Sequence, residues 1–210
     1  MLVPTRELAV QVGQVMHPVS DGLGLKVVVV HGGVSINPQM MALRGGADVV
    51  VATTGRLLDL VAHNALRLSD VQHLVLDEAD RLLELGFADE LQAVLALLPP
   101  QRQTLLFSAT FADDLSVWAH QGLRDPLRMR SDAIEVHDVP DIAQSAIAVD
   151  DKKRTALLRH LIATQGWQRV LVFVATRYAC AHLASKLCTA GVRASALHGD
   201  LSQGGRQAAL

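Results

Sequence analysis

The chain has 210 residues, half of them apolar, and a formal net charge of −2, which suits a globular protein of one large or two small domains. Its longest apolar runs, such as residues 27–30 and 170–175, are far shorter than the roughly 20 residues that cross a bilayer, so no membrane span is expected. Met1 leads directly into LVPTREL, without the basic start and apolar stretch of a signal peptide, which predicts a cytoplasmic protein.

Strand-like apolar runs alternate with helix-like segments along the chain. Continuous Val, Leu and Ile runs of this kind are typical of a parallel sheet covered by helices on both faces, so the sequence predicts an α/β fold. Ligands of such sheets bind beyond the carboxyl ends of the strands. In this sequence, small polar residues follow most of the apolar runs, so they would lie at that edge. The predicted strands lie within LKVVVVHGG, ADVVVATT, HLVLDEAD, QTLLFSAT, AIAV, RVLVFVAT and RASALHG.

The first candidate binding features lie near the amino terminus. Residues 3–11, VPTRELAVQ, predict a strand end, a Thr5 cap and a helix with Arg6 in its first turn. Backbone amides at a helix start and a guanidinium suit a phosphate group. Gly32 and Gly33 permit close approach of a nucleic-acid backbone. Each feature is weak taken singly: the alternative for Thr5 is a simple helix cap, and a glycine pair is more often just a turn.

A cluster of carboxylates follows the third predicted strand. Asp77, Glu78 and Asp80 repel one another, so they face a cation, amides or water, and Mg²⁺ is the cation that such oxygen ligands favour. Asp77 would hold the metal through water, and Glu78 would orient or deprotonate an attacking water. Ser108 and Thr110 of SAT could connect the carboxylates to another domain by hydroxyl hydrogen bonds. The alternative is an acidic helix start, stabilised by about 0.3–1 kcal/mol per charge.

Charge is unevenly distributed in the second half of the chain. Residues 131–151 contain six acids, no base and Pro140, which predicts an inter-domain linker with a boundary near residue 135. Residues 152–210 carry nine bases and one acid, whereas residues 1–130 carry ten bases and fourteen acids. The basic part predicts a surface that faces a polyanion. The alternative is that a continuation outside these residues balances the charge.

The two cysteines predict thiols rather than a disulfide. Cys180 and Cys188 lie eight residues apart on a predicted helix, about 12 Å along its axis, which is too far for a disulfide bond. We therefore expect buried thiols in a reducing compartment.

The ordered set of motifs resembles the DEAD-box family of ATP-dependent RNA helicases over the whole length of the chain. This resemblance implies two RecA-like domains that close over ATP and RNA and destabilise short duplexes. The pieces that carry it are PTRELA, GG, TTGRL, VLDEAD, the LGF at 85–87, SAT, LVFVATR and LHGDLSQGGR.

The resemblance also implies roles for individual residues. Asp77 and Glu78 match the Mg²⁺ and water-activating residues, while Asp80, Ser108 and Thr110 match catalytic and coupling positions. Backbone gripping with little reading of bases fits the low aromatic content of 3%. The implied RNA contacts of the first domain are Pro4, Thr5, Arg6, Gly32, Gly33, Thr53, Gly55 and Arg56; those of the second are Thr176, Arg177, Gly199, Gln203 and Arg206.

Three departures from the family pattern stand out. Thr54 occupies the place of the usual Pro in TPGR, where it could cap a helix instead and leave the RNA contact in place. No G-x-x-x-x-G-K-[ST] phosphate loop occurs in the sequence, nor the adenine-recognising segment expected upstream of it. The chain also stops before the arginines that the family brings to the γ-phosphate.

We therefore expect a helicase fragment with two incomplete domains. Residues 1–134 form a first RecA-like domain without its first strand and phosphate loop, 135–151 a linker, and 152–210 the start of the second domain. One hypothesis is a piece of an ATP-dependent RNA helicase that is inactive alone. A second is a non-catalytic RNA-binding or interaction protein. A third hypothesis is a DNA-directed relative in the same superfamily, which the residues of the PTREL, DEAD and SAT motifs disfavour.

Overall fold

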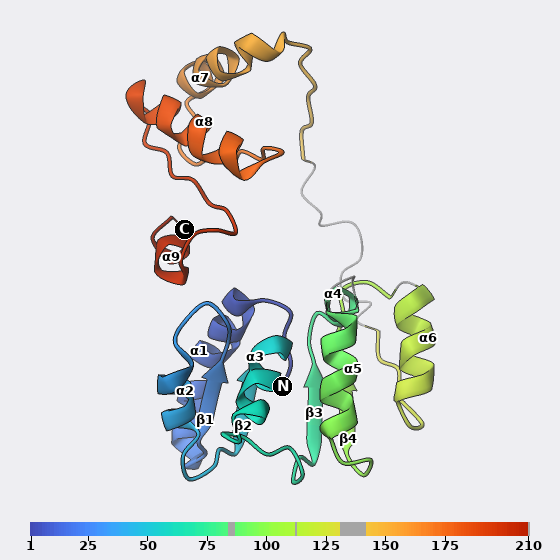
Figure 1. Ribbon diagram of the computed structural model, residues 1–210. Coiled ribbons are helices and arrows are strands. Elements are labelled where there is room, and N and C mark those ends of the chain that lie inside the picture. Colours follow the sequence, from blue (N-terminus) through green and yellow to red (C-terminus); the bar gives the residue numbers. More distant parts are fainter. Residues whose placement is uncertain (84–86, 112, 131–141, 210) are drawn as a thin grey trace. The chain divides into compact units, whose positions relative to one another are not determined.

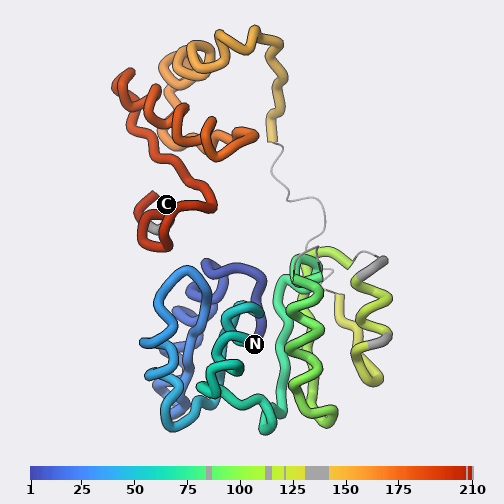
Figure 2. Tube along the Cα trace, in the orientation of Figure 1, coloured from blue at the N-terminus to red at the C-terminus, as the bar shows by residue number. Residues whose placement is uncertain are grey.

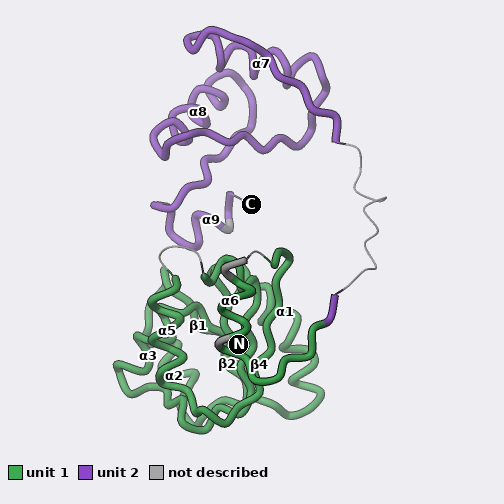
Figure 3. The backbone as a smooth tube through the Cα atoms, turned by 90° about the vertical axis from the view of Figure 1, so that its right-hand side faces the viewer, with its two compact units in different colours: residues 1–128 green, residues 129–210 purple. Residues whose placement is uncertain are grey.

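A computed structural model describes residues 1–83, 87–111, 113–130 and 142–209 of the chain. The chain divides into two compact units, residues 1–128 and 129–210, coloured separately in Figure 3. The boundary predicted near residue 135 lies outside the described residues. Each unit is treated by itself below.

Strands and helices alternate in the first unit, as the Val and Leu runs predict, so the α/β class is confirmed (Figure 1). All four predicted strands of this half are present. The elements are α1 (Arg6–Leu23), β1 (Val27–Val30), α2 (Ile36–Ala42), β2 (Val49–Ala52), α3 (Thr54–Ala62), β3 (His73–Leu76), α4 (Ala79–Leu82), α5 (Ala88–Leu97), β4 (Gln103–Leu106) and α6 (Asp113–Gly122).

Residues 1–3 lie between two parallel strand pairs. β1 pairs with β2 and β3 pairs with β4. Leu2 forms parallel bridges to both Ala52 of β2 and Leu76 of β3. Its amide donates to the Val75 carbonyl at 2.7 Å and its carbonyl accepts from the Asp77 amide at 3.1 Å. The sheet therefore runs in the order β1, β2, residues 1–3, β3, β4.

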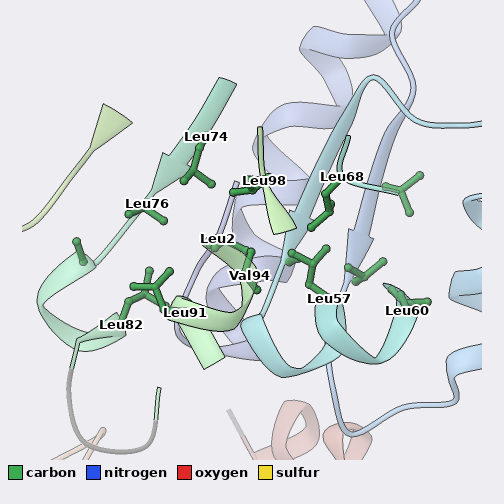
Figure 4. Close-up of a cluster of buried hydrophobic side chains, with 14 of the residues drawn as sticks. Leu2, Leu57, Leu60, Leu68, Leu74, Leu76, Leu82, Leu91, Val94 and Leu98 are labelled. Atoms are coloured by element: carbon green, nitrogen blue, oxygen red, sulfur yellow. The ribbon is translucent and has the colours of Figure 1, made fainter. Parts of the chain in front are cut away.

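Side chains alternate between the two faces of this sheet. One face packs with α3 and α5 into a large leucine-rich core, much of which Figure 4 shows. The other face, with Val3, Val27 and Val51, packs on Ala9 of α1. Because every residue of β1 is valine, this strand contributes to both cores.

The second unit is helical in the residues that the structure describes. It contains a 3₁₀ turn (Asp151–Lys153), α7 (Arg154–Gln165), α8 (Arg177–Thr189) and α9 (Gln203–Ala209), which can be followed from orange to red in Figure 2. The predicted helix with Leu157, Leu158 and Leu161 is α7.

The strands predicted in AIAV, RVLVFVAT and RASALHG are wrong, since residues 146–149, 169–176 and 193–199 have no strand structure. A strand needs a hydrogen-bonded neighbour, and these segments pair with none of the described residues. Leu171 and Phe173 are 75% and 88% exposed as a result. Runs of this composition normally need burial on both faces, but the described residues of the second unit form no sheet.

The cysteine prediction is right about bonding and wrong about burial. Cys180 and Cys188 both lie on α8 and are free thiols. Cys180 is half-buried and Cys188 is exposed. The reason is that no sheet of the second unit covers α8 in the described part of the chain. Among all the residues that the structure describes, no helix is long and apolar enough to cross a membrane.

We predict that the amino group of a polypeptide beginning at Met1 makes its stability depend on pH. This amine donates to the Val50 carbonyl at 2.8 Å, and burial lowers its pKa from 8.0 to about 6. The unfolded chain then holds more protons between these values, so the free energy of unfolding rises by about 2 kcal/mol from pH 6 to pH 8. Urea unfolding across this range measures the change.

An N-acetylated chain is the control, because histidines titrate in the same range in both proteins. Acetylation should remove the part of the pH dependence that comes from the amine. Identical slopes for the free and acetylated chains would contradict the prediction.

Candidate functional site

The carboxyl ends of the strands place the predicted motifs of the first unit along one edge of the sheet. Residues 1–3 lead into Pro4, β1 into His31, β2 into Thr53, β3 into Asp77 and β4 into Phe107. All of these strands are parallel, so their ends meet at the same edge (Figure 1). The strand at residues 1–3 precedes β1 in the chain but lies between β2 and β3, so the order reverses here, where α/β folds bind ligands.

Asp77 and Glu78 form a sharp turn at the end of β3. The Asp77 carboxylate accepts a hydrogen bond from the Glu78 amide at 3.0 Å. Glu78 has φ 47° and ψ 52°, a left-handed conformation that is uncommon outside glycine, and it caps α4. Such backbone strain often accompanies functional turns. The Glu78 carboxylate lies 3.7 Å from Nε of Arg81. This ion pair is exposed, so it contributes little to the stability of the fold.

Asp80 is brought together with the SAT segment. The Thr110 hydroxyl donates to the Asp80 carboxylate at 2.6 Å, and the Ser108 hydroxyl donates to the Thr110 carbonyl at 2.6 Å. The bond from Thr110, assisted by Ser108, holds the pKa of Asp80 below its ordinary value. The Thr110 hydroxyl therefore engages one carboxylate of the cluster within the same unit, and Ser108 binds the backbone of Thr110.

Backbone hydrogen bonds fix the two segments that carry these groups. The Phe107 amide donates to the Leu76 carbonyl at 2.8 Å, and the Ala79 amide donates to the Phe107 carbonyl at 3.0 Å. The ladder between β3 and β4 thus continues past the ends of both strands, which holds Ser108 near the carboxylate turn.

Arg6 lies against the predicted glycine pair. The Thr5 side chain accepts from the Leu8 amide at 3.2 Å and caps α1, as predicted. The Arg6 guanidinium covers Gly33, where an added Cβ would lie 2.1 Å from its Nη1. Gly33 also has φ +76°, so this position favours glycine for two reasons. Pro4, which precedes the cap, is buried.

The TTGR segment forms the start of α3, with one correction. Thr53, not Thr54, is the N-cap, and it makes no side-chain capping bond. Thr54 is the first helical residue, and its buried hydroxyl donates to the Glu90 carboxylate because α5 lies beside α3. Arg56 reaches the glycine loop, where its Nη2 donates to the Val34 carbonyl at 2.9 Å.

Sequence reasoning missed two residues of this edge, Gln39 and Glu90. The Gln39 amide group accepts from the His31 amide at 3.0 Å and donates to the carbonyls of His31 and Ser35 at 3.2 and 3.1 Å. It thereby holds the loop that contains the glycine pair. Only the burial of a polar helix residue marks Gln39, and burial cannot be read from a short amphipathic segment.

The candidate residues of the second unit lie around α8 and α9. Thr176 caps α8 by accepting from the Ala179 amide at 3.1 Å. Arg177 pairs with Asp200, which joins the ATR and HGD segments. Gln203 is buried at the start of α9, Arg206 lies further along it, and Gly199 lies in the exposed loop before it.

Residues 1–116 match the DEAD/DEAH box helicase family. This match covers more than half of the chain. The chain belongs to the DEAD/DEAH box helicase family. Its α/β arrangement is that of incomplete RecA-like helicase domains, which confirms the predicted fold and the resemblance.

Relatives named DEAD-box ATP-dependent RNA helicase CshA match over nearly the whole chain. The proteins of Bacillus cereus (strain ATCC 10987 / NRS 248) and Geobacillus kaustophilus (strain HTA426) are 36% and 37% identical over all 210 residues. That of Streptococcus pneumoniae serotype 4 is 37% identical over 206 residues. The chain spans 40%, 45% and 39% of the length of these relatives, so it corresponds to a fragment of them.

DEAD-box helicases use ATP, generally with Mg²⁺. The described residues contain no group of three or more His, Cys, Asp or Glu side chains close enough to hold a metal together. A Mg²⁺ ion that keeps most of its waters needs only one or two carboxylates beside substrate phosphates. The half-buried Asp77 carboxylate fits such a site, because it offers the oxygen ligands that Mg²⁺ prefers.

We predict that replacing Thr110 by Val raises the pKa of Asp80 toward its ordinary value. The variant keeps the shape of the side chain and removes the hydroxyl that lowers this pKa. A carboxylate whose pKa is lowered by folding contributes its full stabilisation above its unfolded-state pKa and loses it as the pH falls through its folded-state pKa. The variant should therefore shift the acid end of the Asp80 titration, followed by carboxyl ¹³C NMR, to higher pH.

The matched control is Thr104→Val, which changes a threonine of β4 that precedes the SAT segment. Its Asp80 titration should coincide with that of the parent chain. An unchanged Asp80 titration in Thr110→Val would contradict the assigned hydrogen bond.

Proposed function

We propose that these 210 residues belong to an ATP-dependent RNA helicase of the DEAD-box type, which couples destabilisation of RNA duplexes to ATP hydrolysis. The observation that carries this proposal is the meeting of carboxylates, hydroxyls and arginines at one edge of the sheet. Named relatives that align with the whole chain support the same function.

The carboxylate turn would serve ATP hydrolysis. Asp77 would hold Mg²⁺ through water, and Glu78 would orient or deprotonate the attacking water. The metal, when bound, would neutralise charge on the phosphates. Asp80, Ser108 and Thr110 would couple this chemistry to RNA, because their hydrogen bonds tie the turn to a second segment.

The remaining edge would grip the RNA backbone. The capped start of α1 with Arg6 offers amides and a cation, and the glycine pair lets a backbone approach closely. Such contacts read no bases, which suits a helicase that acts on many sequences. The full set proposed is Pro4, Thr5, Arg6, Gly32, Gly33, Thr53, Gly55 and Arg56, with Thr176, Arg177, Gly199, Gln203 and Arg206 of the second unit.

The chain by itself has a narrower proposed activity. Because its sequence holds no G-x-x-x-x-G-K-[ST] loop, we expect it to bind RNA without turning over ATP.

We propose residues 1–134 as the first domain, 135–151 as the linker and 152–210 as the start of the second domain. A non-catalytic RNA-binding role is the second candidate, favoured by nine bases against one acid in residues 152–210. The free thiols of α8 suit a cytoplasmic location.

We predict that the 210-residue chain binds single-stranded RNA without nucleotide and does not hydrolyse ATP. Anisotropy of a labelled oligonucleotide should give a log affinity that falls linearly with log salt concentration, because bound phosphates release counterions. Arg6→Gln should weaken binding and reduce the slope by about one phosphate contact, roughly 0.7 for a single strand. The control Arg67→Gln, in an exposed loop, should change neither.

Three outcomes would count against the proposal. Undetectable RNA binding at low salt would reject the RNA-binding role. ATP turnover that disappears in Glu78→Gln would reject the inactivity of the isolated chain. Equal affinity for single-stranded DNA of the same sequence would contradict an RNA-directed protein.

A further inference from the structure

A buried threonine joins the start of α3 to α5. Thr54 is 1% exposed, and its hydroxyl donates to the Glu90 carboxylate. The same carboxylate lies against Gly55, where an added Cβ would be 3.1 and 3.3 Å from its two oxygens. Glu90 is in the first turn of α5, so its carboxylate connects this helix to the start of α3.

The start of α3 lacks a side-chain cap, although the Thr53 amide donates to the Val30 carbonyl of β1 at 3.2 Å. Thr53 is extended, with φ −82° and ψ 145°, and its side chain makes no capping bond. A helix normally gains stability and a defined first turn from such a cap. The bond from Thr54 to Glu90 provides a tertiary restraint in its place.

Arg56 shows why the orientation of this turn matters. Its side chain is 10% exposed, and its Nη1 is buried with no hydrogen-bond partner among the described residues. Its Nη2 donates to the Val34 carbonyl at 2.9 Å, so the guanidinium is held at the strand-end edge. A shift of the turn would move the Gly55 amide and this guanidinium together.

We propose that Glu90 is a positioning residue that holds the turn at residues 53–56 in the conformation that grips an RNA phosphate. This inference rests on the proposed function, because the ligand is the RNA backbone. Glu90 acts through Thr54 and touches no RNA itself. Its role depends on accepting a hydrogen bond, so a glutamine should replace it.

The backbone geometry supplies an independent way to restrain the turn. Thr54 is the first helical residue and Thr53 is extended, which are the positions that proline and the residue before it prefer. A proline at position 54 would fix φ without any bond to α5. The Thr54→Pro chain should therefore no longer need Glu90.

The test compares variants of the 210-residue chain in two measurements. The first is hydrogen exchange of the Leu57 amide, which donates to the Thr53 carbonyl at 3.0 Å across the first turn of α3, measured without RNA. The second is the affinity for a labelled single-stranded RNA at several salt concentrations. Glu90→Ala and Thr54→Val should each speed Leu57 exchange and weaken RNA binding about 3- to 10-fold, the range expected for one lost hydrogen bond. Glu90→Gln should retain slow exchange and bind at least as well as the parent.

Two further variants separate positioning from a general loss of stability. Adding Glu90→Ala to Thr54→Pro should change neither measurement relative to Thr54→Pro alone. Asp89→Ala, an exposed neighbour in the same turn of α5, should match the parent. Each variant is checked by thermal unfolding, and the isosteric Thr54→Val carries the test if Glu90→Ala unfolds.

The proposal is overturned if Glu90→Ala and Thr54→Val leave Leu57 exchange and RNA affinity unchanged. It is also overturned if Glu90→Ala lowers RNA affinity as much in the Thr54→Pro chain as in the parent. Undetectable RNA binding by the parent would reject the proposed function, whereas Leu57 exchange would still decide whether Glu90 orders the turn.

Discussion

The arrangement of the first unit depends on the backbone of residues 1–3, which hydrogen-bonds to β3 through Leu2 and to β2 through Met1 and Val3. β1 with β2 and β3 with β4 are separate parallel pairs, and residues 1–3 complete the sheet between them. Val3 donates to the Ala52 carbonyl at 3.0 Å on one side, and Leu2 donates to the Val75 carbonyl at 2.7 Å on the other. This insertion brings the strand ends of both pairs to one edge.

The chemistry of that edge is held by bonds between motifs that are distant in the sequence. Thr110 donates to Asp80, Arg56 donates to the Val34 carbonyl, and the Arg6 guanidinium covers Gly33. Each of these contacts joins one strand end to another, so the cations and the carboxylates are fixed by neighbouring loops. A family that binds both a nucleotide and a nucleic acid needs such connections, because each ligand has to be sensed at the site of the other.

The sequence alone predicted the features that depend on local pattern, and it failed where distant partners decide. Val27–Val30 and His73–Leu76 are apolar runs that form strands as expected, and Thr5 caps a helix from its own position. The run around Phe173 has the same composition but finds no pairing partner, so it is not a strand. Glu90 was missed because its partner, Thr54, is 36 residues away. Thr54 was expected to cap a helix, but Thr53 is the N-cap and the buried Thr54 hydroxyl donates to the Glu90 carboxylate of α5 instead.

The most direct test of the account is amide NMR mapping of the isotope-labelled 210-residue chain during titration with a short single-stranded RNA. If the strand ends form one backbone-gripping edge, the amides of Arg6, Gly33 and Gly55 should shift together, with the same apparent affinity. Shifts confined to the basic residues after 152, with these three amides unchanged, would contradict the account.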